Sequence, residues 1–430
     1  ERFMKHYFLV AKDVGDLTAI LSAALEERHD KPVPGLKGMV QRLRGGSRKI
    51  ALKDTTDFIV DHERLNVADD EAFKRDPINL IRMFHIADKR VLALHPDAMR
   101  LAARSLSLID GELREDPDAN RLFLEVVCSK NGPETILRRM NEAGVLGRFV
   151  PEFGKVVAMM QFNMYHHYTV DEHLLRCIGV LSEIEHKSNP ENGLANELMG
   201  TVKNRSLLYV AMLLHDIAKG RPEDHSIAGA RIARRLCPRF GLSPVETETV
   251  AWLVEQHLVM SVVAQSRDLS DRKTIENFAA VVQNLERLKL LTILTTADIR
   301  AVGPGTWNGW KAQLLKTLYY ETEPVLTGGF SEVDRGKRVT AAQSQFRHAL
   351  SDWSDEKVDA YIARHYPPYW LKVDLDTKLV HARFVDATET DGKSLAVHAE
   401  MERVRGITTL MVLAPDHPKL LSVIAGACAA

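Results

Sequence analysis

Apolar residues recur along much of the chain at intervals of three and four positions, which is the spacing of one face of an α-helix. The pattern covers residues 1 to about 30 and returns in Asp76–Arg90 and Gly132–Gly154. Each of the two later segments opens with a capping residue and a proline, as helices often do. Because the last segment breaks at a proline and a glycine, residues 1–154 are predicted to form a helical linker domain.

A second helical region is predicted from residue 155 to residue 330, and its apolar faces carry polar exceptions. His215, for example, falls on the helical stripe formed by positions 207–218. Three further residues stand among apolar neighbours in the same way: His173, His257 and Asp298. A buried carboxylate must be paired, protonated or bound to metal, because an uncompensated buried charge is costly. Four such residues on the inner faces of four helices are typical of a metal site in a helical core.

The pattern changes again toward the end of the chain. A polar joint at Gly328–Gln343 is followed, beyond Pro367, by short alternating runs that predict strands with a turn at Asp391-Gly392. Residues 331–405 are therefore predicted to be connecting helices and strands. The predicted fold class is mainly α, with a helical linker domain, a helical metal-binding domain and a small β-containing C-terminal segment.

The composition is that of an ordinary soluble protein, with 45% hydrophobic and 27% charged residues. The formal net charge of −1 gives no basic field of the kind that attracts nucleic acid or an anionic membrane. No apolar run approaches the roughly 18 residues needed to span a bilayer. The cysteines at 128, 177, 237 and 428 form no CxxC pair, so a reduced cytoplasmic location is expected, with each cysteine a small core residue.

The adjacent pair His215 and Asp216 offers a divalent metal one nitrogen and one oxygen from consecutive residues. His173 lies 42 residues before His215 (215 − 173), and Asp298 lies 82 residues after Asp216 (298 − 216). Two more histidines fall between them: His225 and His257. A lone histidine on an apolar face is usually a hydrogen-bonded core residue. The ordered set favours metal binding instead.

The order H…HD…H…H…D, with LLHDIAKG at Leu213–Gly220, resembles the HD metal-dependent phosphohydrolase superfamily. The resemblance implies that a first metal ion is bound by His173, His215, Asp216 and Asp298. His225 and His257 match the extra histidines of HD proteins that hold two ions, although one could be an outer-sphere or phosphate-binding group. One or two divalent ions are thus expected, with Mg²⁺ or Mn²⁺ ahead of Fe²⁺ or Zn²⁺.

Further site residues surround this ligand set. Asp216 is expected to bridge two ions in catalysis, and Lys219, one helical turn beyond His215, to place a positive charge on a phosphate. The alternative for Lys219 is a helix-end lysine that faces water. Three residues before or near the first ligand are predicted to contact substrate: His166, His167 and Asp171. Their alternative is an ordinary surface position.

The C-terminal residues 406–430 carry a second recognisable pattern. Thr408–Leu413 predicts a strand, followed by a turn at Pro415-Asp416 and a helix that starts near Pro418. This resembles the first strand and helix of an ACT domain, an effector-binding module, here expected to be truncated. The family pattern has a glycine where this chain has Lys419, which puts effector binding at this turn in doubt.

Four longer segments restrict the resemblance to a single enzyme family. ERFMKHYFLVAKDV, HHYTVDEHLLR, TETVAWLVEQH and LLTILTTADIRAVGPGTWNGWKAQLL are similar to the bifunctional uridylyltransferase/uridylyl-removing enzymes of the PII nitrogen-signalling protein. In that family a nucleotidyltransferase domain adds UMP to a tyrosine of PII, an HD domain removes it, and two ACT domains sense glutamine. No nucleotidyltransferase signature precedes residue 60. The chain is therefore expected to be the middle of a longer protein.

The resemblance implies metal-dependent hydrolysis of the phosphodiester between UMP and a PII tyrosine, with glutamine as the effector of the full-length protein. Two alternatives stay open. Guanosine tetraphosphate hydrolases also combine HD and ACT domains, but the stretch from Trp310 to Thr408 leaves little room for their additional domains. A non-catalytic HD/ACT sensor module is disfavoured by the full ligand set. Metal analysis and incubation with uridylylated PII distinguish these classes.

Overall fold

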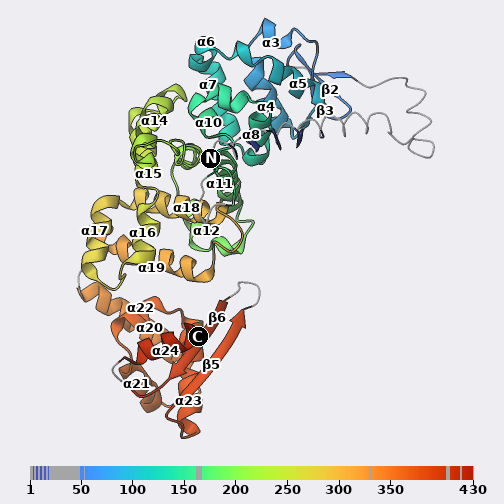
Figure 1. Cartoon of the computed structure of the whole chain (residues 1–430). Coiled ribbons are helices and arrows are strands. Elements are labelled where there is room, and N and C mark those ends of the chain that lie inside the picture. The colour runs from blue at the N-terminus through green and yellow to red at the C-terminus, as the bar shows by residue number, and fades with distance from the viewer. Residues whose placement is uncertain are drawn as a thin grey trace, which may run out of the picture. The chain divides into compact units, whose positions relative to one another are not determined.

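A computed structural model describes most of the chain after residue 48. The described residues are 49–52, 54–160, 167–328, 332–402, 407–416 and 419–429, with single positions between residues 3 and 18. These single positions are helical, as predicted, and the remainder of the predicted N-terminal helix lies outside the described residues. Helices dominate (Figure 1), which confirms the mainly α class. No helix in the described ranges is both long and apolar enough to cross a membrane.

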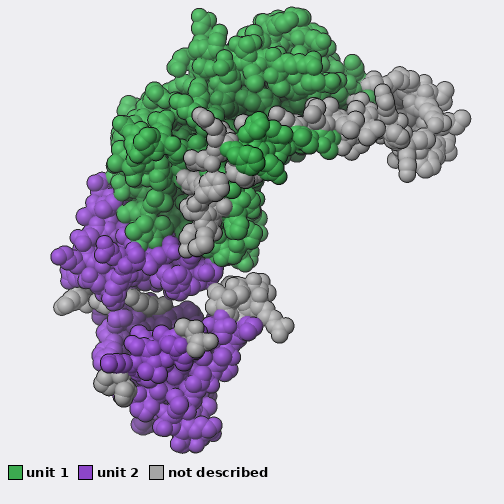
Figure 2. Space-filling view, in the orientation of Figure 1, with its two compact units in different colours: residues 1–262, 286–307 green, residues 263–285, 308–430 purple. Residues whose placement is uncertain are grey.

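The chain forms two compact units (Figure 2). Unit 1 contains residues 1–262 and 286–307, and unit 2 contains residues 263–285 and 308–430. The predicted linker domain and most of the predicted metal-binding domain thus belong to one unit. Residues 308–330 group with the C-terminal part of the chain.

Unit 1 begins with a small sheet that the helical pattern did not predict. Its strands follow the order β1-β2-β3-β4, with β3 and β4 parallel and the other pairs antiparallel. The bounds are β1 (Ile50–Ala51), β2 (Phe58–Asp61), β3 (Arg64–Val67) and β4 (Ala93–Leu94). The β2–β3 turn holds His62 and Glu63 at φ of 46° and 62°. Such turns usually carry glycine or asparagine, so this hairpin lacked its usual sequence signal.

Helices then build the rest of the N-terminal part of unit 1. They are α3 (Ala72–Arg75), α4 (Asn79–Arg90), α5 (Pro96–Arg104), α6 (Gly111–Glu115), α7 (Pro117–Val127), α8 (Pro133–Glu142), α9 (Val145–Phe149) and α10 (Pro151–Val156), with a 3₁₀ turn at Leu106–Leu108. Gly132 and Pro133 start α8 as predicted. The backbones of α9 and α10 approach closely, because a Cβ on Gly154 would lie 2.7 Å from the Gly147 carbonyl oxygen.

The predicted metal ligands lie on, or directly after, helices of the following part of the chain. These helices are α11 (Val170–His186), α12 (Leu194–Met199), α13 (Arg205–Leu214), α14 (His225–Arg239), α15 (Pro244–Gln256), α16 (Val259–Ser266) and α18 (Leu285–Ala301), with a 3₁₀ turn at Pro190–Asn192. Every residue of α13 from Leu207 to Leu214 is buried, which explains its nearly continuous apolar sequence. The predicted periodicity of α13 is therefore real, but the helix is covered on all sides.

Unit 2 is also mainly helical. Its helices are α17 (Arg272–Val282), α19 (Gly309–Thr327), α20 (Glu332–Ala349), α21 (Asp355–Ala363), α22 (Pro367–Lys372) and α23 (Leu375–Thr390). The prediction of strands between Pro367 and the turn at Asp391-Gly392 is wrong, because α22 and α23 occupy this stretch. Asp374 caps α23 by accepting a hydrogen bond from the Thr377 backbone N–H at 2.8 Å. Leu375, Leu379 and Ala382 then follow helical spacing and pack into one core. The apolar residues that alternate in the sequence thus belong to one face of a helix.

The C-terminal residues form a hairpin and a helix. β5 (Ala396–Glu402) pairs antiparallel with β6 (Ile407–Leu413), and α24 (Leu420–Ala429) follows. The predicted strand Thr408–Leu413 and the helix after it are confirmed. Lys419 has φ of 71°, the left-handed conformation that glycine adopts easily.

The cysteines only partly follow the prediction that each is a core residue. Cys177 and Cys237 are buried, Cys128 is intermediate and Cys428 is exposed. The prediction is wrong for Cys428, which lies on α24. All four are free thiols.

Candidate metal centre

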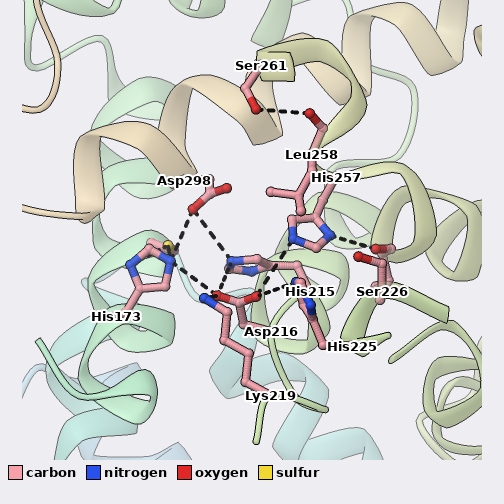
Figure 3. Close-up of polar contacts among 12 residues, drawn as sticks. His173, His215, Asp216, Lys219, His225, Ser226, His257, Leu258, Ser261 and Asp298 are labelled. Atoms are coloured by element: carbon pink, nitrogen blue, oxygen red, sulfur yellow. Dashed lines mark hydrogen bonds and ion pairs between the residues drawn. The ribbon is translucent and has the colours of Figure 1, made fainter. Parts of the chain in front are cut away.

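Six side chains from unit 1 converge on one point (Figure 3). We call this set the Asp216 cluster: His173, His215, Asp216, His225, His257 and Asp298. Four of them lie at the end of a helix or directly beyond it, and Asp216 follows His215 in the sequence. His215 and His257 are the C-capping residues of α13 and α15, and His225 is the first residue of α14.

Asp216 occupies the middle of the cluster, and its two oxygens face different histidine pairs. Oδ2 lies 3.4 Å from Nε2 of His215 and 3.7 Å from Nε2 of His173. Oδ1 lies 3.6 Å from Nε2 of His225 and 3.7 Å from Nε2 of His257. These separations exceed the usual hydrogen-bond length of about 3.2 Å or less. They suit neighbouring ligands of a shared ion better than bonded partners.

Asp298 lies beside His173 and His215, the two histidines that face Asp216 Oδ2. Its Oδ1 lies 3.1 Å from His173 Nε2 and 3.7 Å from His215 Nε2. The Asp298 side chain is 16% exposed, whereas those of His173, His215 and Asp216 are 4% exposed or less. The cluster is therefore buried, and it is more open at Asp298 and at His225, whose side chain is 27% exposed.

Backbone carbonyls orient two of the histidines. Nδ1 of His215 lies 2.8 Å from the Met212 carbonyl, and Nδ1 of His257 lies 2.8 Å from the Val254 carbonyl. A carbonyl oxygen can only accept, so each Nδ1 carries the proton and donates it. In the neutral imidazole this leaves the Nε2 lone pair directed at the cluster, as in metal-binding histidines.

The electrostatics of the cluster reflect its burial and its mixed charges. Burial by itself lowers the pKa of His215, but the Asp216 and Asp298 carboxylates outweigh it and raise this pKa to about 10. Burial likewise raises the pKa of Asp216, yet the His215 and Lys219 charges hold it well below its ordinary value. Burial and the neighbouring His215 lower the pKa of His257 to about 4.

Several buried atoms of the cluster have no hydrogen-bond partner. These atoms are His215 Nε2, Asp216 Oδ1 and His225 Nε2. A buried polar atom left unpaired costs about 1–3 kcal/mol, so such atoms at one point call for a ligand. The potential ligand atoms form two groups, and within each group all atoms lie within 4.8 Å of one another. The first group is His173, Cys177, His215 and Asp298. The second group is Asp216, His225 and His257. This nitrogen- and oxygen-rich donor set fits one or two divalent cations.

Lys219 also reaches the cluster. Its Nζ lies 2.6 Å from Asp216 Oδ2, and its side chain is 11% exposed. The alternative of a lysine that faces water is therefore wrong. The ammonium group is placed where it can contact an anion bound beside Asp216.

The predicted substrate-binding residues have different positions. His166 lies outside the described residues. His167 is exposed and lies next to Gly303, where an added Cβ would be 2.3 Å from the His167 ring. Asp171 is buried, and its carboxylate accepts hydrogen bonds from the Asn141 side chain and the Ala158 backbone N–H, both at 3.0 Å. These contacts give Asp171 a structural role at the start of α11.

Cys177 is a member of the site that sequence reasoning assigned to the core alone. Its Sγ lies 3.5 Å from His173 Nε2, one helical turn farther along α11. Burial, with the nearby Asp298 and Asp216 carboxylates, raises the pKa of this thiol. The signal was present in the sequence as the spacing of four between His173 and Cys177, which places both on one helical face.

Comparison with known proteins agrees with this architecture. Residues 58–149 match the family described as the third domain of uridylyltransferase GlnD, and residues 170–299 match the HD domain. Two bifunctional uridylyltransferase/uridylyl-removing enzymes, from Bradyrhizobium diazoefficiens and Nitrobacter winogradskyi, are 65% and 64% identical to the whole of this chain. The chain covers 46% of each relative and so spans about half their length. It belongs to the family of bifunctional uridylyltransferase/uridylyl-removing enzymes.

Proposed function

We propose that this chain carries the uridylyl-removing activity of its family. In this proposal it hydrolyses the phosphodiester that joins UMP to a tyrosine of the PII signalling protein. One or two divalent ions would be held by the Asp216 cluster, with Mg²⁺ or Mn²⁺ as the expected metal. The observation that carries the proposal is the position of Asp216, whose two carboxylate oxygens face two separate groups of histidines.

Each residue of the cluster has a distinct part in the proposal. His173, His215 and Asp298 would hold the first ion with Asp216 Oδ2, and His225 and His257 the second with Asp216 Oδ1. The distances of 3.4–3.7 Å between Asp216 and these four histidines support the division. A bound ion lowers the pKa of its water to supply hydroxide at neutral pH and neutralises phosphoryl oxygens.

The protein supplies charge and position around the phosphate. Lys219 would place its ammonium group beside a phosphoryl oxygen, since Nζ already contacts Asp216 at 2.6 Å. The more exposed side chains of Asp298 and His225 mark the side from which a protein-bound phosphodiester can enter. A tyrosine phenolate has a conjugate acid with a pKa of about 10, so its departure needs no strong general acid.

The remaining parts of the chain would serve this reaction indirectly. We assign residues 1–154 to a linker domain, residues 155–330 to the hydrolytic domain and residues 331–405 to the connection. Residues 406–430 would begin an ACT domain, through which the full-length protein would respond to glutamine. The left-handed conformation of Lys419 at the turn before α24 supports this last assignment.

Incubation of the chain with uridylylated PII and Mn²⁺ or Mg²⁺ tests the proposal. Release of UMP, followed by chromatography, is the expected result, and Asp216→Asn should abolish it. His186→Ala is a matched control, because His186 lies on α11 as His173 does but is exposed. A parallel reaction with guanosine tetraphosphate should release no pyrophosphate. Cleavage of that nucleotide alone would favour the second enzyme class, and a metal-bound but inactive chain would favour the sensor.

A further inference from the structure

Cys177 places a sulfur atom among the nitrogen and oxygen atoms of the first metal position. Its Sγ lies 3.5 Å from His173 Nε2, and both atoms belong to a group with His215 and Asp298 whose ligand atoms are all within 4.8 Å of one another. Two ligands of one tetrahedral zinc ion lie about 3.5 Å apart, given metal–ligand distances of about 2.0–2.3 Å. The separations of 3.5, 3.1 and 3.7 Å between Cys177 and His173, His173 and Asp298, and His215 and Asp298 are compatible with ligands of one ion.

A second observation points to a ligand at the same place. Nε2 of His215 belongs to the group, is buried in a side chain with 0% exposure and has no hydrogen-bond partner. The carbonyl of Met212 fixes the opposite ring nitrogen, so Nε2 is directed into the group. Cys177 itself is fully buried on α11. No disulfide partner competes for its thiol, which is free.

We infer that Cys177 is a ligand for thiophilic ions at the first metal position and sets the metal preference of this site. With Zn²⁺, Co²⁺ or Fe²⁺, the Cys177 S–H bond breaks, a sulfur–metal bond forms and the proton leaves to solvent. Hard ions such as Mg²⁺ and Mn²⁺ prefer oxygen ligands and leave the thiol protonated. The same site thus has two coordination modes, one with sulfur and one without.

The two modes differ in their consequence for the proposed reaction, on which this part of the inference rests. With Cys177 bound, the thiolate would join His173, His215, Asp216 and Asp298 around the ion and would take the position that water otherwise occupies. Closed four-ligand sites are structural, whereas catalytic sites keep one position open for water. A zinc-loaded chain is therefore expected to hydrolyse the phosphodiester more slowly than a manganese-loaded one.

X-ray absorption of the unmodified, zinc-loaded chain tests the inference without a variant. With one zinc ion per chain at the first position, the expected spectrum contains one sulfur neighbour at about 2.3 Å in addition to nitrogen and oxygen at about 2.0–2.2 Å. A spectrum with nitrogen and oxygen alone would overturn the role of Cys177 and leave the metal centre intact. Failure to bind any metal would overturn the metal centre as well, so the two failures are distinguishable.

Variants provide an independent readout. Cobalt bound to the unmodified chain should show a near-ultraviolet sulfur-to-cobalt charge-transfer band, which Cys177→Ser should lose. Cys237→Ser is the matched control, because Cys237 is equally buried but lies on α14 outside the group, and it should keep the band. In competition with Mn²⁺, Cys177→Ser should lower the preference for Zn²⁺ by at least about 10-fold. An unchanged band or an unchanged preference in a folded Cys177→Ser chain would contradict the inference.

Discussion

The cores of unit 1 and unit 2 differ in what completes them. Unit 1 gathers two carboxylates and four histidines at one point, with three buried nitrogen or oxygen atoms that lack hydrogen-bond partners. Unit 2 has an aromatic core, which we define as Phe346, Leu350, Val358, Tyr361, Trp370 and Ala382. Both potential metal groups found among the described residues lie in unit 1. The aromatic core also has a buried atom without a hydrogen-bond partner, Trp370 Nε1, but it stands among apolar rings and not among potential metal ligands. The Asp216 cluster gathers several such atoms at one point and therefore calls for a cation.

The aromatic core of unit 2 is held together by ring packing. Phe346 stacks on Tyr361 with ring centroids 5.3 Å apart and meets Trp370 edge-on at 5.2 Å. At its margin the Tyr369 hydroxyl bonds to the Tyr361 hydroxyl at 3.0 Å and to His381 Nδ1 at 3.2 Å. These rings bury large apolar areas, so their contribution to stability requires no ion. The comparison predicts that changes in one core leave the properties of the other unchanged.

The largest expected effect is on activity. Asp216→Asn replaces a central carboxylate by a neutral amide, which is a weak metal ligand. Hydrolysis of uridylylated PII should fall by at least about 10²–10³-fold, the loss typical of a removed electrostatic group. Steady-state rates and the metal content of the purified variant provide the measurement. A variant with wild-type turnover would remove Asp216 from the centre.

The matching change in unit 2 should affect stability instead. Phe346→Ala opens a cavity in the aromatic core and should cost about 3–5 kcal/mol in the free energy of unfolding of this region. Hydrogen exchange should increase in α21 and α23, while the metal content and the rate per folded molecule stay as in the wild type. Loss of bound metal in this variant would show that the two cores are coupled.

Removal of metal should have the converse effect. A chelator should increase hydrogen exchange in α11, α13 and α15, because metal binding stabilises only the folded state. At an ion concentration of about 100 times the dissociation constant, this contribution is about 2.7 kcal/mol. Exchange in α21 and α23 should not change. Equal protection of the α11–α15 region with and without chelator would contradict a metal-completed core.

A smaller effect distinguishes the two sides of the cluster. His257→Ala removes one of the two histidines that face Asp216 Oδ1 at 3.6 and 3.7 Å. The metal content should fall from about two ions per chain toward one, and the remaining ion should stay with His173 and Asp298. Elemental analysis of dialysed protein measures this. If the content does not change, His257 is an outer group that orients its neighbours.

The sequence predicted the Asp216 cluster better than it predicted the elements around it. Ligand-type residues on apolar helical faces, together with the resemblance to HD proteins, identified six residues, and the distances around Asp216 show that these lie together. The strands expected beyond Pro367 were helices, because a capping aspartate and helical spacing outweigh a β-like composition over so short a stretch. Cys177 was assigned to the core because a buried cysteine is usually inert, and only the fold shows what its sulfur faces.

The most direct test of the central claim is an anomalous-scattering map from crystals of the chain grown with Mn²⁺. The account predicts one peak between His173, His215 and Asp298, and a second beside His225 and His257, with Asp216 bridging them. Two-metal hydrolytic sites typically separate their ions by about 3.5–4 Å. A map with no peak within coordination distance of Asp216, from protein that hydrolyses uridylylated PII, would contradict the account.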